Sequence, residues 1–370
     1  MYALTHCTIY TGDDVLSHHA VLVKDGFIES VVLHDSIPPE YERIDLHDCD
    51  LTAGFVDMQL YGGSTGFFVK DLSIECLENI VQTHRQDGTV ALVPTLYSTS
   101  MERILQAIEV TKVYIQSGRR GVLGLHIEGP FINYEKRGAH SAAQVRVPTH
   151  AEIETIIQAS QGLLTVMTIA PEIWPDDLLQ LLKNSHIVVS VGHTNATYQQ
   201  AQRFLNEDFP LATHLYNAMR PFESREPGVV GAIFDSSRAH ASIIVDGHHC
   251  DFATVRIAKQ LLGERLFLIS DATFAKMEAQ RFEFEGFTAN YDGHRLLNDD
   301  DKLAGSAITL LDAVRNCIKY VGIPKAEVFR MAATYPAQRL GVGHLYGKIK
   351  DGYKADLICL DKNLTIKKLG

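Results

Sequence analysis

Hydrophobic positions in the central part of the chain fall into short apolar runs, most of which end in a polar or ionisable residue. Segments with the apolar spacing of helices, such as 73–86 and 100–116, lie between most of these runs. This alternation of strands and helices predicts an α/β fold, a parallel (β/α)8 TIM barrel over residues 51–344. A doubly wound open sheet is the alternative, because strand counts from sequence are prone to error. The eight runs are 51–59, 89–96, 122–128, 164–171, 187–193, 210–214, 241–246 and 266–271.

The two ends of the chain have a different pattern. Short alternating segments separated by Gly- and Asp-containing turns occupy residues 8–33, which is typical of a small antiparallel sheet. A similar pattern returns over 346–360, and we expect a short last strand after it. We therefore predict one small β domain built from residues 1–50 together with 345–370.

A polar segment, residues 272–303, interrupts the alternation after the eighth run. It contains Asn298-Asp-Asp-Asp301 and alternates between polar and aromatic residues over 281–285. We interpret it as an extended excursion or lid next to the eighth strand. A solvated insertion without a catalytic role is the alternative.

Composition narrows the choice of partners. The 370 residues are 46% hydrophobic and 21% charged, as in ordinary globular proteins. The net charge of −11 argues against broad binding to nucleic acid or to an anionic membrane. An anionic small substrate would therefore need cationic groups of its own in the site. Six scattered cysteines indicate buried thiols, and the N-terminal sequence lacks the features of a signal peptide, so we expect a cytoplasmic protein.

Ionisable residues end four of the later runs, namely Glu128, His193, His214 and Asp271. In a parallel barrel the carboxyl ends of the strands converge on one face. One carboxylate and two imidazoles can hold a divalent metal and leave a position for water, and Asp271 can then take the proton of that water. Each residue alone is more often structural, but the four together favour a metal site.

Longer motifs follow one another in order along nearly the whole chain. They are LHIEGPFI at 125–132, KRGAH at 136–140, VGHTNAT at 191–197, THLYNAM at 213–219, REPG at 225–228, DGHH at 246–249, SDAT at 270–273, LAGS at 303–306 and TYPA at 334–337. Together they resemble the N-acetylglucosamine-6-phosphate deacetylases of the amidohydrolase superfamily. The resemblance implies a metal-dependent barrel with a small β-sandwich domain. It also implies a homodimer that removes the acetyl group of N-acetylglucosamine 6-phosphate in amino-sugar catabolism.

The resemblance also implies a role for individual residues. It makes Glu128, His193 and His214 metal ligands, Asp271 the catalytic acid and base, and His140 a contact of the amide carbonyl. The implied contacts of the sugar phosphate are Asn217, Ala218, Arg225 and His249, with backbone contacts from Ala139, Leu303, Ala304 and Gly305. The guanidinium fork of Arg225 suits a phosphate, whereas a surface salt bridge with Glu223 or Glu226 is the alternative for this residue.

The chain departs from the family pattern at two places. Many superfamily members carry His-x-His at the end of the first strand for a second metal, where this chain has Gln59 and Tyr61. We therefore expect one divalent metal ion per subunit, with zinc suiting the ligands and iron, cobalt or manganese as alternatives. After Asp271 the family usually has Ala-Thr-Ala-Pro-Ala-Gly, whereas this chain has Ala272-Thr-Phe-Ala-Lys276. The loop over the substrate should differ accordingly.

Other functions are compatible with parts of this pattern. The galactosamine epimer of the substrate shares the chemistry, and the sequence separates the two poorly. A cyclic-amide hydrolase of the same superfamily is expected to carry a carboxylated lysine or His-x-His, and neither is evident. A barrel that has lost catalysis and only binds a ligand is disfavoured by the four strand-end residues occurring together.

Overall fold

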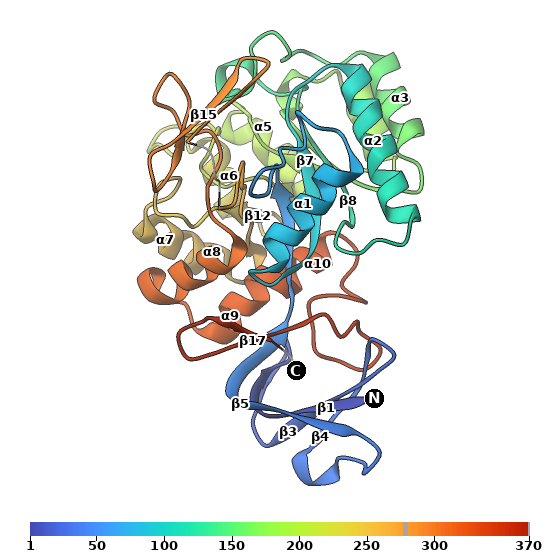
Figure 1. Ribbon diagram of the computed structural model, residues 1–370. Helices are drawn as coiled ribbons and strands as arrows, with labels where there is room; N and C mark the ends of the chain where they lie inside the picture. The colour runs from blue at the N-terminus through green and yellow to red at the C-terminus, as the bar shows by residue number, and fades with distance from the viewer. Residues whose placement is uncertain (277–279, 369–370) are drawn as a thin grey trace.

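The computed structural model describes residues 1–276 and 280–368. A barrel of strands and helices forms the larger part of the molecule, and a small β domain lies at one end of it (Figure 1). Both ends of the chain lie in or next to the small domain (Figure 1).

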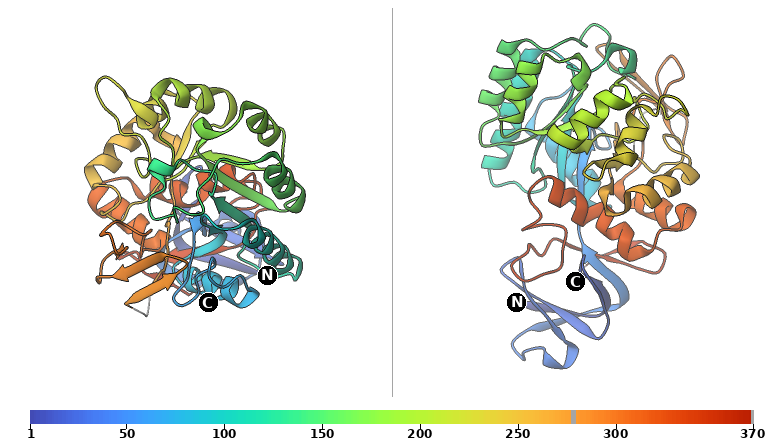
Figure 2. Two further views of the ribbon diagram at one scale, coloured as in Figure 1. Left: turned by 90° about the horizontal axis from the view of Figure 1, so that it is seen from above. Right: turned by 180° about the vertical axis from the view of Figure 1, so that it is seen from behind.

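Eight parallel strands form the predicted barrel in the chain order β6 to β13. The first and last strands meet through a bridge between Leu60 and Ala272, and the backbone N–H of Asp271 donates to the carbonyl of Gln59 at 2.9 Å. The view from above shows the ring that these strands and their helices make (Figure 2). The strands are β6 (Phe55–Leu60), β7 (Thr89–Leu96), β8 (Gly124–Glu128), β9 (Leu164–Ile169), β10 (Val188–Val191), β11 (Leu211–Ala212), β12 (His240–Ile243) and β13 (Leu266–Leu268).

Helices cover the outside of the barrel and begin where the sequence places capping residues. Ser73, Ser100 and Thr149 each accept a hydrogen bond from a backbone N–H of the first helical turn, which satisfies a donor that the helix cannot satisfy itself. The helices are α1 (Ile74–Arg85), α2 (Met101–Gln116), α3 (His150–Ala159), α4 (Asp176–Lys183), α5 (Tyr198–Arg203), α6 (Gly228–Asp235), α7 (Phe252–Leu262), α8 (Leu310–Asn316), α9 (Lys325–Phe329) and α10 (Tyr335–Arg339).

One seven-stranded sheet combines the two ends of the chain in the small domain. Side chains that alternate along β1 and β3 pack on opposite faces of this sheet, with Leu4 and Val21 in one apolar cluster and Ala3 and Ala20 in another. Residues 51–53, which the sequence pattern assigns to the first barrel strand, instead end the long strand β5. The strands are β1 (Tyr2–Tyr10), β2 (Val15–Leu16), β3 (His19–Lys24), β4 (Phe27–Leu33), β5 (Glu42–Ala53), β17 (Leu357–Leu360) and β18 (Ile366–Lys367).

The polar segment after the eighth barrel strand forms a three-stranded antiparallel sheet, which we call the lid. Its strands are β14 (Arg281–Phe284), β15 (Phe287–Tyr291) and β16 (Leu296–Leu297). The lid lies at the end of the barrel opposite the small domain (Figure 1). Although the segment is polar as a whole, Phe287 is buried and Phe282 packs against the barrel core.

Asp57 lies inside the barrel between the first and last strands. One oxygen of its carboxyl group accepts from the backbone N–H groups of Gln59 at 3.2 Å and Ser270 at 3.3 Å. Burial raises the pKa of Asp57 to about 7, although these hydrogen bonds act in the opposite direction. Asp57 thus links the two strands that close the barrel. All six cysteines are buried and free, and no described helix is long and apolar enough to cross a membrane.

The capping box of α3 provides a test of the fold. Thr149 and Glu152 satisfy each other's backbone N–H groups at the start of this helix. We expect Thr149→Ala to lower the free energy of unfolding by about 1 kcal/mol. Thr155→Ala, an exposed change in the middle of the same helix, should have little effect because alanine favours helices. Urea unfolding of both variants measures the difference, and equal midpoints would contradict the role of the cap.

Candidate metal centre and catalytic cavity

A cavity with about 740 Å³ of empty space, including its open mouth, lies where the carboxyl ends of the barrel strands meet. This is the face on which TIM-barrel enzymes carry out their chemistry. Glu128, His193, His214 and Asp271, which the sequence places at strand ends, all line it. The lid contributes Phe287 to the same wall.

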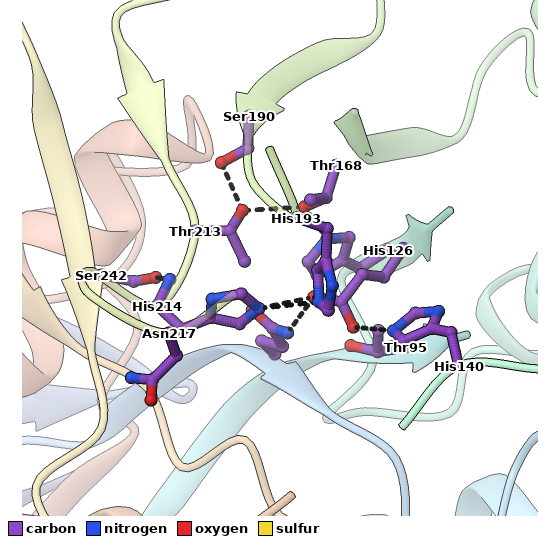
Figure 3. Close-up of polar contacts among 12 residues, drawn as sticks. Thr95, His126, His140, Thr168, Ser190, His193, Thr213, His214, Asn217 and Ser242 are labelled. Atoms are coloured by element: carbon purple, nitrogen blue, oxygen red, sulfur yellow. Dashed lines mark hydrogen bonds and ion pairs between the residues drawn. The ribbon is translucent and has the colours of Figure 1, made fainter. Parts of the chain in front are cut away.

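The imidazole rings of His193 and His214 face each other (Figure 3). The carboxylate of Glu128 lies close to both rings. The Oε1 atom of Glu128 lies 3.0 Å from Nε2 of His214 and 3.3 Å from Nε2 of His193, and the two imidazole nitrogens are 3.1 Å apart. A tetrahedral metal with bonds of about 2.0–2.2 Å holds its ligand atoms about 3.3–3.6 Å apart. The three atoms therefore need to separate by only a few tenths of an ångström to hold a divalent cation.

The hydrogen bonds of His193 leave one ring nitrogen free for a metal. Its Nδ1 donates to the backbone carbonyl of Lys136 at 2.8 Å. In the neutral ring Nε2 then carries a lone pair, and this is the atom that faces Glu128 and His214. The arrangement is the one found around metal-bound histidines, where an acceptor fixes the tautomer and the ring orientation.

His140 lies next to His193 and is also close enough to Glu128 to be considered as a ligand. Possible ligand atoms of Glu128, His140 and His193 lie within 4.8 Å of one another. However, Nδ1 of His140 accepts the backbone N–H of Ser98 at 3.2 Å, so the proton of a neutral ring is on Nε2. That Nε2 is 3.5 Å from Oε2 of Glu128. His140 is thus arranged as a hydrogen-bond donor, while Nε2 of His214 lies closer to the carboxylate of Glu128, at 3.0 Å from Oε1.

The carboxylate of Glu128 is fully enclosed by polar side chains. Gln59 donates to Oε1 at 2.8 Å, and the hydroxyl of Tyr61 donates to Oε2. Burial by itself would raise the pKa of Glu128, but the imidazoles of His140, His193 and His214 hold it well below its usual range. Gln59 and Tyr61, at the place of a second metal's histidines, therefore serve as hydrogen-bond donors to the carboxylate of Glu128.

The backbone at the strand ends is strained in a way that aims these side chains. His193, His214 and Asp271 have φ values of 48°, 35° and 53°, in the left-handed region that residues other than glycine rarely adopt. Such a conformation costs of order 1–3 kcal/mol and concentrates at functional sites. Three of the four strand-end residues identified in the sequence therefore have backbone conformations that only the surrounding fold can maintain.

Asp271 lines the cavity with one carboxylate oxygen, Oδ1, that has no hydrogen-bond partner among the described residues. Burial raises the pKa of Asp271, and the carboxylates of Glu128 and Asp57 act in the same direction, while His214 opposes them. A carboxyl group with a raised pKa binds a proton more readily than a free one, as a general acid and base must.

Asn217, Ala218 and His249 also line the cavity. Asn217 lies beyond His214 on the side away from His140 (Figure 3). Nδ1 of His249 lies 2.7 Å from Oδ2 of Asp246, which fixes the orientation of the imidazole ring. Burial would raise the pKa of Asp246, but the hydrogen bonds from His249 and His248 lower it to about 2. Ala139, Leu303 and Gly305 also line the cavity, as the sequence comparison implies.

Two of the sequence-predicted site residues lie off the cavity wall. Ala304 is buried, and its carbonyl accepts from the hydroxyl of Thr273 at 2.7 Å. Arg225 is exposed and makes no ion pair with the described residues. Among the described residues Arg225 forms neither of the alternative salt bridges, with Glu223 or with Glu226. Oε1 of Glu226 accepts the backbone N–H groups of Tyr198 and Gly228.

Sequence reasoning missed the aromatic side of the cavity. Phe67, Tyr97 and Phe287 line it together with Tyr61. The sequence draws attention to Tyr61 only as a departure from His-x-His. Phe67 and Tyr97 follow barrel strands in loops whose course no motif predicts. Phe287 lies in the lid, where the alternation of polar and aromatic residues was the available signal.

Comparison with known families and proteins agrees with this geometry over the whole chain. Residues 1–48 match the NagA composite domain, and residues 51–369 match the amidohydrolase family. The N-acetylglucosamine-6-phosphate deacetylase of Haemophilus influenzae is 36% identical over 99% of this chain and 96% of that protein. The N-acetylgalactosamine-6-phosphate deacetylase of Escherichia coli O157:H7 is 30% identical over 98% of this chain and 95% of that protein.

Solved structures of such enzymes have the same fold. The N-acetylglucosamine-6-phosphate deacetylase of Pasteurella multocida superposes with a TM-score of 0.94 at 34% identity, over 99% of this chain and 96% of that one. A mutant of the Mycobacterium smegmatis enzyme, in complex with N-acetyl-D-glucosamine 6-phosphate, has a TM-score of 0.90 at 30% identity, over 99% and 96% of the two chains. The chain therefore belongs to the amidohydrolase family, among the N-acetylglucosamine-6-phosphate deacetylases.

Proposed function

We propose that this protein hydrolyses N-acetyl-D-glucosamine 6-phosphate to D-glucosamine 6-phosphate and acetate, as a step of amino-sugar catabolism in the cytoplasm. The observation that carries the proposal is the convergence of Glu128, His193 and His214 with Asp271 in one cavity of an amidohydrolase barrel. The glucosamine epimer is preferred to the galactosamine epimer because the relative acting on the former is 36% identical and the relative acting on the latter is 30% identical.

In this proposal one divalent cation is held by Oε1 of Glu128 and by Nε2 of His193 and His214. Two imidazoles and one carboxylate suit zinc, and iron, cobalt or manganese also bind such ligands. When bound, the cation would lower the pKa of a water molecule and polarise the amide carbonyl. Gln59 and Tyr61 already donate to Glu128, and neither offers the imidazole that a second cation would require.

The chain's own residues account for the proton transfers. Asp271 would accept the proton of the attacking water while the water oxygen bonds to the carbonyl carbon. His140 would donate from Nε2 to the carbonyl oxygen, on which negative charge develops. Asp271 would then return the proton to the sugar nitrogen as the carbon–nitrogen bond breaks, leaving acetate and a free amino sugar.

Binding of the sugar phosphate is proposed for the end of the cavity at Asn217, Ala218 and His249. The exposed Arg225 does not line the cavity of its own chain, so we propose that its guanidinium completes the phosphate site of a partner subunit in a homodimer. A bidentate guanidinium is well suited to a phosphate. In a chain of net charge −11, such a group would offset the repulsion of an anionic substrate.

Replacing Asp271 tests the proton transfers. Asparagine has nearly the shape of aspartate but cannot carry the proton, so Asp271→Asn should lower turnover by about 10²- to 10⁴-fold. Acetate release gives the rate, while circular dichroism and metal analysis of the same sample control for folding and metal content. Turnover within a few-fold of the unchanged protein would mean that Asp271 is structural.

Metal content tests the number of cations. Because Gln59 and Tyr61 donate hydrogen bonds to Glu128 and offer no site for a second cation, the purified protein should retain one tightly bound divalent cation per chain. His193→Ala should lose this cation. Elemental analysis after dialysis against metal-free buffer measures both proteins. Two cations per chain, about 3.5–4 Å apart as in two-metal enzymes, would rule out the single-metal site.

Replacing Arg225 tests phosphate recognition. A charge-assisted hydrogen bond contributes roughly 1.5–3 kcal/mol, and about 1.4 kcal/mol corresponds to a tenfold change in binding. Arg225→Ala should therefore raise KM for the 6-phosphate about ten- to a hundredfold and leave the unphosphorylated sugar nearly unaffected. Arg203→Ala, another exposed arginine, is the control. An equal loss with both sugars would assign Arg225 a structural role.

Mixed dimers test whether Arg225 serves the cavity of its own chain or that of the partner subunit. Arg225→Ala and Asp271→Asn are each expected to be poorly active alone. A dimer containing one chain of each kind would have one complete pocket, in which Asp271 of one chain meets Arg225 of the other. Co-expression should restore activity, and the absence of any recovery would show that Arg225 serves its own chain.

A further inference from the structure

The two sides of the cavity differ chemically. Asn217 lies beyond His214, on the side away from His140 (Figure 3), and its side-chain amide is 3.7 Å from Sγ of Cys250, the chain neighbour of His249. Both Asn217 and His249 line the cavity. On the side of His140, aromatic rings pack next to one another. The ring of Tyr97 meets His140 edge-on at 5.7 Å between centroids, and Phe287 follows at 5.4 Å from Tyr97. Phe287 in turn stacks on Phe67 at 5.6 Å with an angle of 16° between the rings. We call Phe67, Tyr97 and Phe287 the aromatic wall.

The lid holds this wall in place through a second layer of rings. Phe282 of β14 packs against Phe67 at 4.7 Å and against Phe274 at 5.0 Å, and Phe274 stacks on Phe67 at 5.4 Å. Phe282 and Phe274 are absent from the cavity lining. Phe274 is the residue at which this chain departs from the usual sequence after Asp271. The departure and the lid therefore contribute to one aromatic cluster, which closes one end of the cavity.

The chemistry of an amide determines what this end can receive. The carbonyl carbon carries the sugar nitrogen on one side and the acyl chain on the other. With the carbonyl oxygen at His140 and the sugar phosphate at Asn217 and His249, the acyl chain must extend toward the aromatic wall. We propose that Phe67, Tyr97 and Phe287 form the acyl subsite, and that Phe287 restricts the substrate to an acetyl group. This inference rests on the proposed deacetylation.

Tight packing is the reason for the restriction. Phe67, Tyr97 and Phe287 are 3%, 5% and 7% exposed, so each ring is held by its neighbours and has little room to move away from a longer acyl chain. Moving a packed ring costs energy because side chains in protein interiors fit closely. Enzymes typically discriminate against one additional methylene by about 10- to 200-fold. The lid thus determines the length of the acyl chain that is hydrolysed.

A series of substrates measures the subsite directly. Glucosamine 6-phosphate carrying an N-acetyl, N-propionyl or N-butyryl group is hydrolysed by the metal-loaded protein, and kcat/KM is determined from release of the amine. The unchanged protein should lose at least about tenfold per added methylene. Phe287→Ala should raise the ratio of butyryl to acetyl kcat/KM at least tenfold. Ratios within one sample are independent of the fraction of active protein.

Phe284→Ala is the matched control, because it removes a ring from strand β14 of the same lid, which lies against Arg103 and makes no ring contact with the aromatic wall among the described residues. It should leave the ratio unchanged even if it lowers both rates. The inference is overturned if Phe287→Ala leaves the ratio unchanged, if Phe284→Ala shifts it equally, or if the unchanged protein hydrolyses all three amides alike. Failure of the unchanged protein to release acetate from the acetyl substrate would instead refute the proposed function.

Discussion

The buried carboxylate of Glu128 receives hydrogen bonds from Gln59 and Tyr61 and faces three imidazoles, at the end of a strand inside the barrel. An isolated charge at such a place would be strongly destabilising, so the surrounding groups have to compensate it. The groups that do so come from several barrel strands and from loops between them. Compensating this one charge therefore constrains how the strand ends are arranged, and the same arrangement creates the candidate metal site and brings Asp271 into the same cavity.

The parallel strands of the barrel bring their carboxyl ends together around the cavity. The backbone conformation at these ends determines where the side chains point. His193, His214 and Asp271 turn into the cavity because each has a left-handed backbone at or just beyond a strand end. The closure of the barrel through Asp271 and Gln59 joins the proposed acid or base to the strand that carries Gln59 and leads to Tyr61. Stability of the fold and geometry of the site are thus maintained by the same contacts.

The sequence predicts the barrel, the small β domain and the strand-end residues, because apolar periodicity and ionisable run ends are local signals. It misplaces residues 51–53, since the apolar run continues without a polar break from the end of β5 through Gly54 into β6. It also cannot predict the aromatic wall, because Phe67 and Phe287 are 220 positions apart and meet only through the lid. The exposed position of Arg225 likewise depends on tertiary structure and, in our proposal, on a second subunit.

The central claim is that one divalent cation is held by Glu128, His193 and His214 while His140 remains a hydrogen-bond donor. A crystal structure of the metal-loaded protein, with anomalous scattering recorded at the absorption edge of the metal, tests it most directly. We predict a single anomalous peak about 2.0–2.2 Å from Oε1 of Glu128 and from Nε2 of His193 and His214. A peak bonded to His140 in place of His214, or a second peak beside Gln59 and Tyr61, would contradict the account.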